Sequence, residues 1–419
     1  MYKTNRQLGL LYVVSMIIAF TTRYGDVMLG YEHQIIIGAL WVMSGIISVL
    51  YKNKRNIRVQ NYRWGVKIFL IPHIIIHLYT IVLMMLGKVS FSYFTTNMTV
   101  YIPTMVAITS VYFFGKNAFK YNAMAVIGSW TLSIIVSLIL KGPAIIPQAI
   151  IQAYIDPYST YGGIQHNYFE LHDLVLGIGY IFVFYLFTQQ KVNKRNLLIG
   201  FATLLILTLG MKRITVIGIF LAFVFHFLIR RMKDKNQLKV CLLAGWAAFV
   251  VCYLFIFILS QGSLLFEILG KYDINFAGRN YYYQAIMKYS SFSPTYLGIG
   301  RNVVTQIFNS ELSYMRVGGA HSDVIKMYVE NGFILFGLWL WYYLINVTKQ
   351  FRNHYGSKTA ITYFGLTIYT FTLYLTDNIE IYFICQILSI SISLCYAIDG
   401  EMTKETLAHS NNKNFGMYS

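Results

Sequence analysis

The sequence predicts an all-α polytopic membrane protein with about twelve transmembrane helices. Of its 419 residues, 57% are hydrophobic and only 12% are charged, whereas a soluble globular protein has about 25% charged residues. The apolar residues also come in runs long enough to cross a hydrocarbon core of about 30 Å as helices. Too little charge is present to cover soluble domains, and the hydrophobicity excludes a disordered chain.

The predicted spans follow one another along almost the whole chain. The first is not expected to be a cleaved signal peptide, because further spans follow and no small-residue cleavage site ends it. The seventh and eighth are short and separated only by Lys212 and Arg213, so they form either two spans in a hairpin or one long bent helix. The twelve runs are 8–22, 34–51, 68–87, 98–115, 123–141, 170–188, 197–211, 214–229, 240–260, 324–348, 359–376 and 379–398.

The basic residues test this count. With the amino terminus inside, 23 of the 34 Lys and Arg residues fall in loops or tails that face the cytoplasm, as the positive-inside rule requires. Merging the seventh and eighth runs would put every later loop on the wrong side. The hairpin is therefore favoured, with Arg213 at the outer surface and both termini cytoplasmic. The net charge of +18 then mostly reflects topology, and no nucleic-acid partner is expected.

The domain organisation follows from the loop lengths. We expect helices 1 to 9 over 1–260, a large outer loop over 261–323, and helices 10 to 12 with a cytoplasmic tail over 324–419. Within the large loop, 303–312 has helical apolar spacing and is expected to lie flat on the membrane.

No metal, cofactor or disulfide framework is expected. All four cysteines fall inside predicted spans and lack paired metal spacing. His73 and His77 are four residues apart, but no Glu-x-x-His pattern or third ligand accompanies them, so we interpret both as structural. Gly298-x-Gly300 lacks the strand, third glycine and helix of a nucleotide site.

Several arginines are expected on the outer side, against the positive-inside rule. They are Arg213, Arg279 and Arg301. Guanidinium groups bind phosphate in a bidentate geometry and stay protonated, so three of them converging would suit a lipid pyrophosphate. Contacts with ordinary headgroups or solvent remain the alternative.

A polar motif introduces the tenth span. His321 stands where it could act as a general base, and Asp323 could cap the helix or act on substrate. Glu330 lies about two turns further, inside the apolar run, where a carboxylate is costly and suggests function. An interfacial histidine with a capping aspartate is the alternative.

Other polar residues form weaker candidates for sugar binding. His166 precedes the sixth span, and Asp377 and Glu380 flank a short outer turn. The turn chemistry of Asp-Asn explains that last pair equally well. Tyr282 lies beside Arg279 and could stack on a sugar ring.

The motifs, taken in order, resemble those of the O-antigen polymerase (Wzy) and O-antigen ligase superfamily. His321-x-Asp323-x6-Glu330-x-Gly332-x4-Gly337 is similar to the element that opens the tenth span of that family. The segments around Arg213, Ala277-Gly278-Arg279 and Leu297-Gly298-Ile299-Gly300 match three further elements. Lys212 stands where the family has serine, and Ser322 where asparagine is frequent.

The resemblance implies a C-type membrane glycosyltransferase at the periplasmic face of the bacterial inner membrane. Such an enzyme polymerises undecaprenyl-pyrophosphate-linked oligosaccharides without a metal or cofactor. It implies that Arg213 and Arg279 hold the pyrophosphate and that His321 is the base or orients the acceptor. Its partners would be the lipid-linked oligosaccharide and the bilayer, with a chain-length regulator as a further candidate.

Two alternatives stay open. A ligase that moves finished polymer onto lipid A core shares every motif. A flippase for the same lipid belongs to a different class, in which repeated halves and interrupted helices are frequent. The sequence predicts neither feature here.

Overall fold

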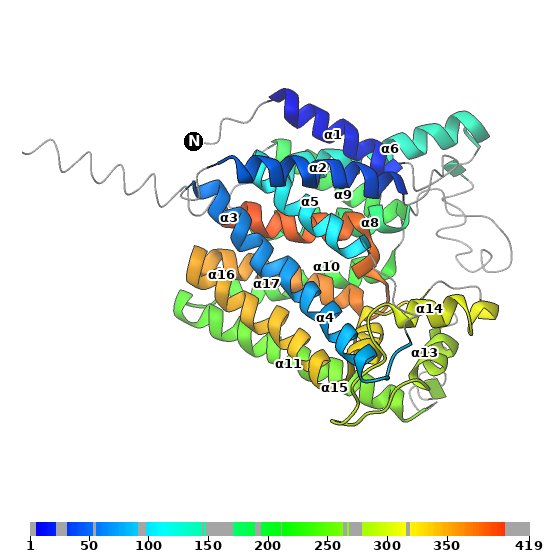
Figure 1. Cartoon of the computed structure of the whole chain (residues 1–419). Helices are drawn as coiled ribbons and strands as arrows, with labels where there is room; N and C mark the ends of the chain where they lie inside the picture. The colour runs from blue at the N-terminus through cyan, green and yellow to red at the C-terminus, as the bar shows by residue number, and fades with distance from the viewer. Residues whose placement is uncertain are drawn as a thin grey trace, which may run out of the picture.

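All regular structure in the described part of the chain is helical (Figure 1). The computed structural model describes residues 6–21, 32–52, 56–90, 98–144, 146–147, 171–188, 194–210, 212–262, 266–267, 279–315 and 319–398. The first half contains α1 (Arg6–Thr21), α2 (Glu32–Leu50), α3 (Ile57–Gly65), the π-helical turn η1 (Val66–Leu70), α4 (Ile71–Met85), α5 (Met98–Phe114), α6 (Asn117–Lys141) and α8 (His172–Thr188).

The second half continues in the same way. It contains α9 (Lys194–Gly210), α10 (Arg213–Arg230), α11 (Asp234–Ser260), α13 (Arg279–Met287), α14 (Val303–Asn309), the 3-10 turn η4 (Ser313–Met315), α15 (Asp323–Trp341), the π-helical turn η5 (Tyr342–Asn346), α16 (Val347–Tyr355), α17 (Ser357–Tyr374), the 3-10 turn η6 (Ile379–Ile381) and a last apolar helix, Phe383–Ile398.

Five of these helical segments are long and apolar enough to cross a membrane. They are Glu32–Leu50, Ile57–Met85, Asn117–Lys141, Arg213–Arg230 and Asn236–Ser260. Large apolar side chains on them face outward, with Leu40 62%, Phe220 61% and Leu243 70% exposed. Apolar faces of this extent need lipid around them. The prediction of an all-α membrane protein is confirmed.

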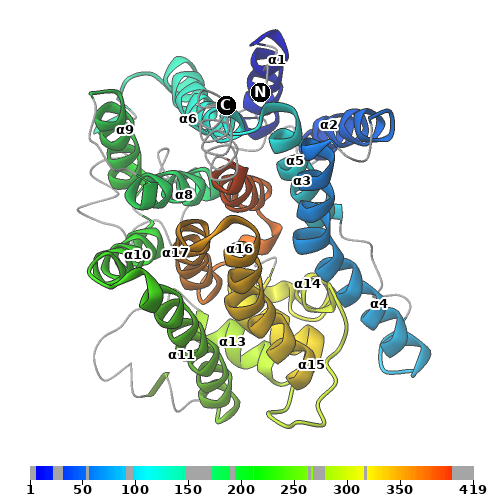
Figure 2. The same ribbon diagram turned by 90° about the vertical axis from the view of Figure 1, so that its left-hand side faces the viewer.

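The helices surround α17, which lies near the middle of the bundle (Figure 2). α17 packs against α8, α10, α11 and α16. One hydrophobic cluster joins α1, α5, α6, α8 and the last helix, and a second joins α11, α13, α14 and α15. Residues of α17 belong to both clusters, so the carboxyl end of α17, with Phe371 and Leu373, lies where they meet.

The seventh and eighth predicted runs are separate helices. α9 ends at Gly210 and α10 begins at Arg213. The backbone of Lys212, between them, is extended, with φ −75° and ψ 94°. One long bent helix is thereby excluded, and Lys212 sits directly at the start of α10.

The expectation that 303–312 lies flat on the membrane is wrong. A helix does form there, α14, but its apolar side chains Val303, Val304, Ile307 and Phe308 are buried. They join the cluster that includes α11, α13 and α15. The apolar spacing therefore fits a protein core, which periodicity alone does not distinguish from a lipid surface. α13 and α14 lie together at one end of the molecule (Figure 1).

The structure has an interrupted helix that the sequence did not predict, at Gly332. There α15 breaks, with φ 75° and ψ 179°, a conformation that is essentially limited to glycine. Backbone from 296–300 fills the break. The Gly300 N–H donates to the Glu330 carbonyl at 2.8 Å, and the Phe333 N–H donates to the Tyr296 carbonyl at 2.9 Å. A Cβ atom on Gly298 would overlap the backbone of 330–332, and a Cβ atom on Gly332 would overlap the backbone of 296–298. The two motif glycines therefore allow these two segments to pack directly against each other.

Candidate functional site

Polar residues from four parts of the chain meet at the carboxyl end of α17. His321 lies two residues before α15 in a left-handed conformation, with φ 48°, which is uncommon outside glycine and typical of functional sites. Its ring centre lies 6.0 Å from that of Tyr282 on α13. The Tyr283 hydroxyl donates to the His321 carbonyl at 3.2 Å. We call His321, Tyr282, Arg279, Lys212 and Asp377 the outer cluster.

Charge acts on His321 from both sides. Burial lowers the pKa of the His321 imidazole, the Asp377 carboxylate opposes this shift, and Arg279 and Lys212 add to it. The Lys212 Nζ lies 4.0 Å from Oδ2 of Asp377. The outer cluster therefore combines two fixed cations with a histidine that favours its neutral form near pH 7.

Three helices begin at this cluster. Lys212 directly precedes α10, Arg279 is the first residue of α13, and Asp323 is the first residue of α15. Helix amino termini carry partial positive charge, which favours anions. At α15 the Asp323 and Ile325 N–H groups are already hydrogen-bonded, so that helix contributes through its dipole. Because Lys212 and Arg279 add full charges, the arrangement suits a strongly anionic ligand.

A second, buried group of charges lies next to the outer cluster. The Arg301 Nη2 lies 2.7 Å from Oε1 of Glu380, and the Lys326 Nζ lies 3.9 Å from Oε2 of the same carboxylate. The His73 Nδ1 is 3.9 Å from Glu380 Oε1. All four side chains are at most 7% exposed. We call Arg301, Lys326, Glu380 and His73 the inner cluster.

Arg301 is held in place from several directions. Its backbone N–H donates to the Thr80 hydroxyl at 2.8 Å, and its Nη1 contacts the Met327 sulfur at 3.4 Å. Burial alone would lower the pKa of the guanidinium, but Glu380 and Glu330 outweigh it and raise the pKa. Arg301 is therefore a fixed charge inside the protein.

Backbone hydrogen bonds connect the two clusters. The Asp323 N–H donates to the Asp377 carbonyl at 3.2 Å, and the Glu380 N–H donates to Oδ2 of Asp323 at 2.8 Å. Asp377 Oδ1 accepts from the Tyr382 hydroxyl at 2.7 Å. The turn 377–380 is thus fastened to the start of α15, and it carries both Asp377 of the outer cluster and the buried Glu380.

Asp323 does not cap α15, which was one of its two expected roles. Ser322 is the N-cap, because its hydroxyl accepts from the Ile325 N–H at 3.3 Å and donates to the Tyr374 carbonyl at 3.1 Å. Asp323 is instead fully buried and holds the turn 377–380. Its predicted action on substrate stays a prediction.

The other residues predicted for the site lie in different surroundings, some exposed and some buried. Arg213 is exposed at the start of α10, and its neighbour Lys212 is the residue that reaches Asp377. Arg301 is 2% exposed, so its guanidinium is engaged by Glu380 and does not face the outer surface as expected. Glu330 is buried, and its Oε1 accepts from the Val304 N–H at 3.3 Å. His166 lies outside the described residues.

Sequence reasoning missed Lys326, although a lysine inside an apolar run is a signal in itself. His73 was interpreted as structural, and the metal site weighed against that interpretation finds no ligand cluster among the described residues. The relation of His73 to Glu380 depends on tertiary structure.

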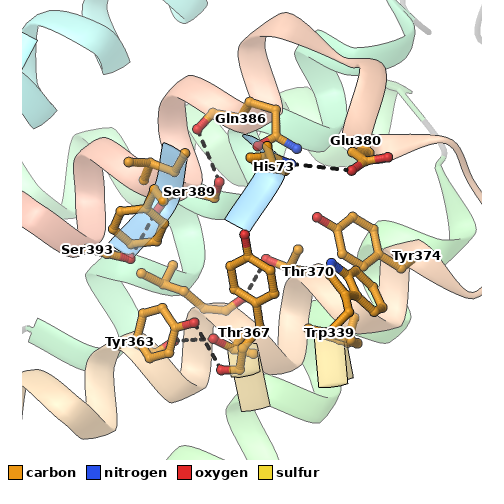
Figure 3. A pocket seen from close by; sticks show the side chains of 15 residues that line it. His73, Trp339, Tyr363, Thr367, Thr370, Tyr374, Glu380, Gln386, Ser389 and Ser393 are labelled. Carbon is orange, nitrogen blue, oxygen red and sulfur yellow. Dashed lines mark hydrogen bonds and ion pairs between the residues drawn. The ribbon is translucent and has the colours of Figure 1, made fainter. Parts of the chain in front are cut away.

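A cavity of about 60 Å³ lies beside the inner cluster, with His73 and Glu380 among its lining residues (Figure 3). No protein-family model matches the chain, and a search of curated proteins finds no match. The function is therefore interpreted from the geometry of the site and from the order of its motifs.

Proposed function

We propose that the protein is a membrane glycosyltransferase that polymerises undecaprenyl-pyrophosphate-linked oligosaccharide repeat units into O-antigen or capsule-like polysaccharide. The observation that carries this proposal is the outer cluster, in which Lys212, Arg279, His321 and Asp377 meet at one end of a membrane-embedded bundle. A lipid pyrophosphate combines a strong anion with an apolar tail. Fixed cations at the end of lipid-facing helices suit both parts.

The reaction assigns a task to each group. An acceptor hydroxyl on the incoming repeat unit attacks the anomeric carbon of the growing chain, and the bond from that carbon to the pyrophosphate breaks. His321 takes the hydroxyl proton, for which the neutral imidazole is required. Arg279 and Lys212 stabilise the charge that develops on the leaving pyrophosphate. Tyr282 offers a ring face to a sugar.

We propose twelve membrane crossings, with both termini in the cytoplasm of a bacterial cell and the outer cluster at the periplasmic face of the inner membrane. The 23 basic residues on the opposite side support this orientation. Fusing a reporter enzyme that is active only in the periplasm after residues 232 and 262 tests it. We expect activity only at the second position, and the reverse pattern would refute the topology.

One observation favours transport as a second candidate, because the break in α15 at Gly332 is a feature that transporters share. Backbone from 296–300 fills this break, however, so it does not open into a site. A deletion strain separates the functions. Surviving single-repeat surface glycan supports the polymerase, free lipid-linked polymer supports the ligase, and repeat units trapped inside support the flippase.

The site assignment is tested by Arg279→Ala and His321→Ala, each expected to abolish polymer while the protein still inserts. Tyr281→Ala is the matched control, because Tyr281 lies on the same helix as Arg279 and is 66% exposed. We expect the control to keep polymer of normal length. Long-chain glycan in both site variants would overturn the assignment.

A further inference from the structure

The cavity beside the inner cluster follows α17 and the last helix into the bundle (Figure 3). On α17 its lining extends from Tyr363 to Tyr374, and on the last helix from Gln386 to Ser393. Eleven residues of helix correspond to roughly 16 Å, about half of a 30 Å hydrocarbon core. The cavity therefore extends from the inner cluster well into the membrane region.

Four hydroxyls of its polar lining can accept hydrogen bonds from an occupant. Thr367, Thr370, Ser389 and Ser393 each donate their hydroxyl proton to a carbonyl on their own helix, at 2.7–3.2 Å. Each hydroxyl oxygen has two lone pairs, and within the described residues only that of Thr370 already accepts a bond, from the Tyr180 hydroxyl at 3.0 Å. A small hydrogen-bond donor therefore suits these positions.

Water fits these conditions and a metal cation does not. A water molecule needs about 10–15 Å³ of such space and two to four polar partners, so about 60 Å³ holds several. Glu380, the lining carboxylate, already faces Arg301 at 2.7 Å and Lys326 at 3.9 Å, and both cations would repel another one.

An unpartnered nitrogen points to the same occupant. In the described part of the chain, the Nδ1 of His73 has no hydrogen-bond partner, although the residue is only 6% exposed. It lies 3.9 Å from Oε1 of Glu380, too far for a direct hydrogen bond. Two polar atoms at this distance are commonly bridged by a water molecule.

The backbone around the cavity is irregular on two sides. Phe69 lies in the π-helical turn η1 and Tyr343 in the π-helical turn η5, and both line the cavity. The Tyr342 hydroxyl donates to the Ile68 carbonyl at 3.0 Å and joins the two turns. π-turns are rare and concentrate at functional sites, which favours a specific role over a packing defect.

We propose that this cavity is an internal water site that solvates the inner cluster and bridges His73 Nδ1 to Glu380. The ionisable groups around it are His73, Glu380, Tyr343, Tyr363 and Tyr374, with Arg301 and Lys326 behind Glu380. The proposal does not depend on the transferase reaction, because every observation that supports it is a contact inside the helix bundle.

Radiolytic hydroxyl-radical footprinting of the unaltered protein tests the hydration. Bound water generates radicals in place, so Tyr363 and Trp339, which line the cavity, should be oxidised despite their burial. Tyr12 and Tyr369 are 0% exposed, do not line the cavity, and serve as internal controls. We expect at least a fivefold higher rate at the cavity residues. Equal rates would overturn the proposal.

A second measurement tests the contact between water and His73. Ser389→Leu and Ser393→Leu fill the cavity with apolar atoms, whereas Ser48→Ala on α2, away from the cavity, is the control. Exchange of the His73 ring N–H with solvent, followed by ¹⁵N NMR of histidine-labelled protein, should slow at least tenfold in the filled variants only. An unchanged exchange rate in folded filled variants would refute the bridging water.

Discussion

The buried ion pair between Arg301 and Glu380 makes the sharpest prediction. Arg301→Met keeps a side chain of similar length and removes the charge that lies 2.7 Å from the carboxylate. Removing one partner of a buried pair costs about 3–5 kcal/mol, because the other charge stays buried without compensation. Lys326 remains 3.9 Å from Glu380 and compensates partly, so we expect the lower end, about 3 kcal/mol.

The assay is a double-mutant cycle on purified protein, in which unfolding is followed in mixed detergent and SDS micelles. The variants are Arg301→Met, Glu380→Gln and the combination of both. If the pair is coupled as the structure indicates, the double variant should be less destabilised than the sum of the single ones, by about 1.5 kcal/mol or more. Additive effects, or a cost below about 0.5 kcal/mol for Arg301→Met, would refute the reasoning.

Three further predictions follow from the same region. Gly332→Ala should destabilise the protein by about 3 kcal/mol or more, because the residue has φ 75° and faces the 296–298 backbone; Gly200→Ala, with open space around it, should be neutral in the same unfolding assay. Tyr283→Phe removes the hydrogen bond to the His321 carbonyl and should lower the free energy of unfolding by about 1 kcal/mol; an unchanged melting curve would contradict this prediction. Burial lowers the pKa of His321, so its base form persists below pH 6.5, and the polymerisation rate should stay level from pH 8 to about 6.5 and fall only in more acid buffer; a rate already falling at pH 7.5 would exclude His321 as the base.

The helices could be predicted because their signals are local. An apolar run of the right length predicts a helix whatever surrounds it, and the Lys212-Arg213 pair predicts the gap between α9 and α10. Which neighbour covers the apolar face of a helix cannot be predicted from the helix sequence alone. The apolar face of α14 looks the same in sequence whether lipid or α15 covers it, so the membrane-surface expectation for 303–312 was wrong.

Part of the candidate site could be predicted from motif order, and part could not. The sequence indicates a histidine and an arginine on the outer side, and the structure brings His321 and Arg279 together. The pairing of Arg301 with Glu380 depends on how the outer loop enters the break at Gly332. No local rule states which carboxylate a buried arginine meets, so Arg301 was expected to face phosphate.

Burying the polar side chains of the inner cluster costs free energy of desolvation, so a functional reason for the cluster is expected. Apolar residues of similar volume often replace a buried ion pair without loss of stability, so stability alone does not explain four buried polar side chains. The Glu380 N–H holds Asp323, and the Asp323 N–H holds the Asp377 carbonyl. These bonds use the backbone of the turn 377–380, and Arg301 holds the Glu380 side chain, so the ion pair adds a second anchor to the turn that places Asp377 next to Lys212.

This positioning role can be separated from stability in one variant. Arg301→Met combined with Lys326→Met and Glu380→Leu replaces the three buried charges with apolar side chains, so that no cation is left facing a lost carboxylate, and we expect a fold nearly as stable as the original protein. The turn 377–380 then loses its anchor at Arg301 but keeps its backbone bonds to α15, so polymer formation should fall at least tenfold through a lower kcat. If this variant is stable and fully active, the inner cluster does not position the outer one, and its buried charges serve only the water site.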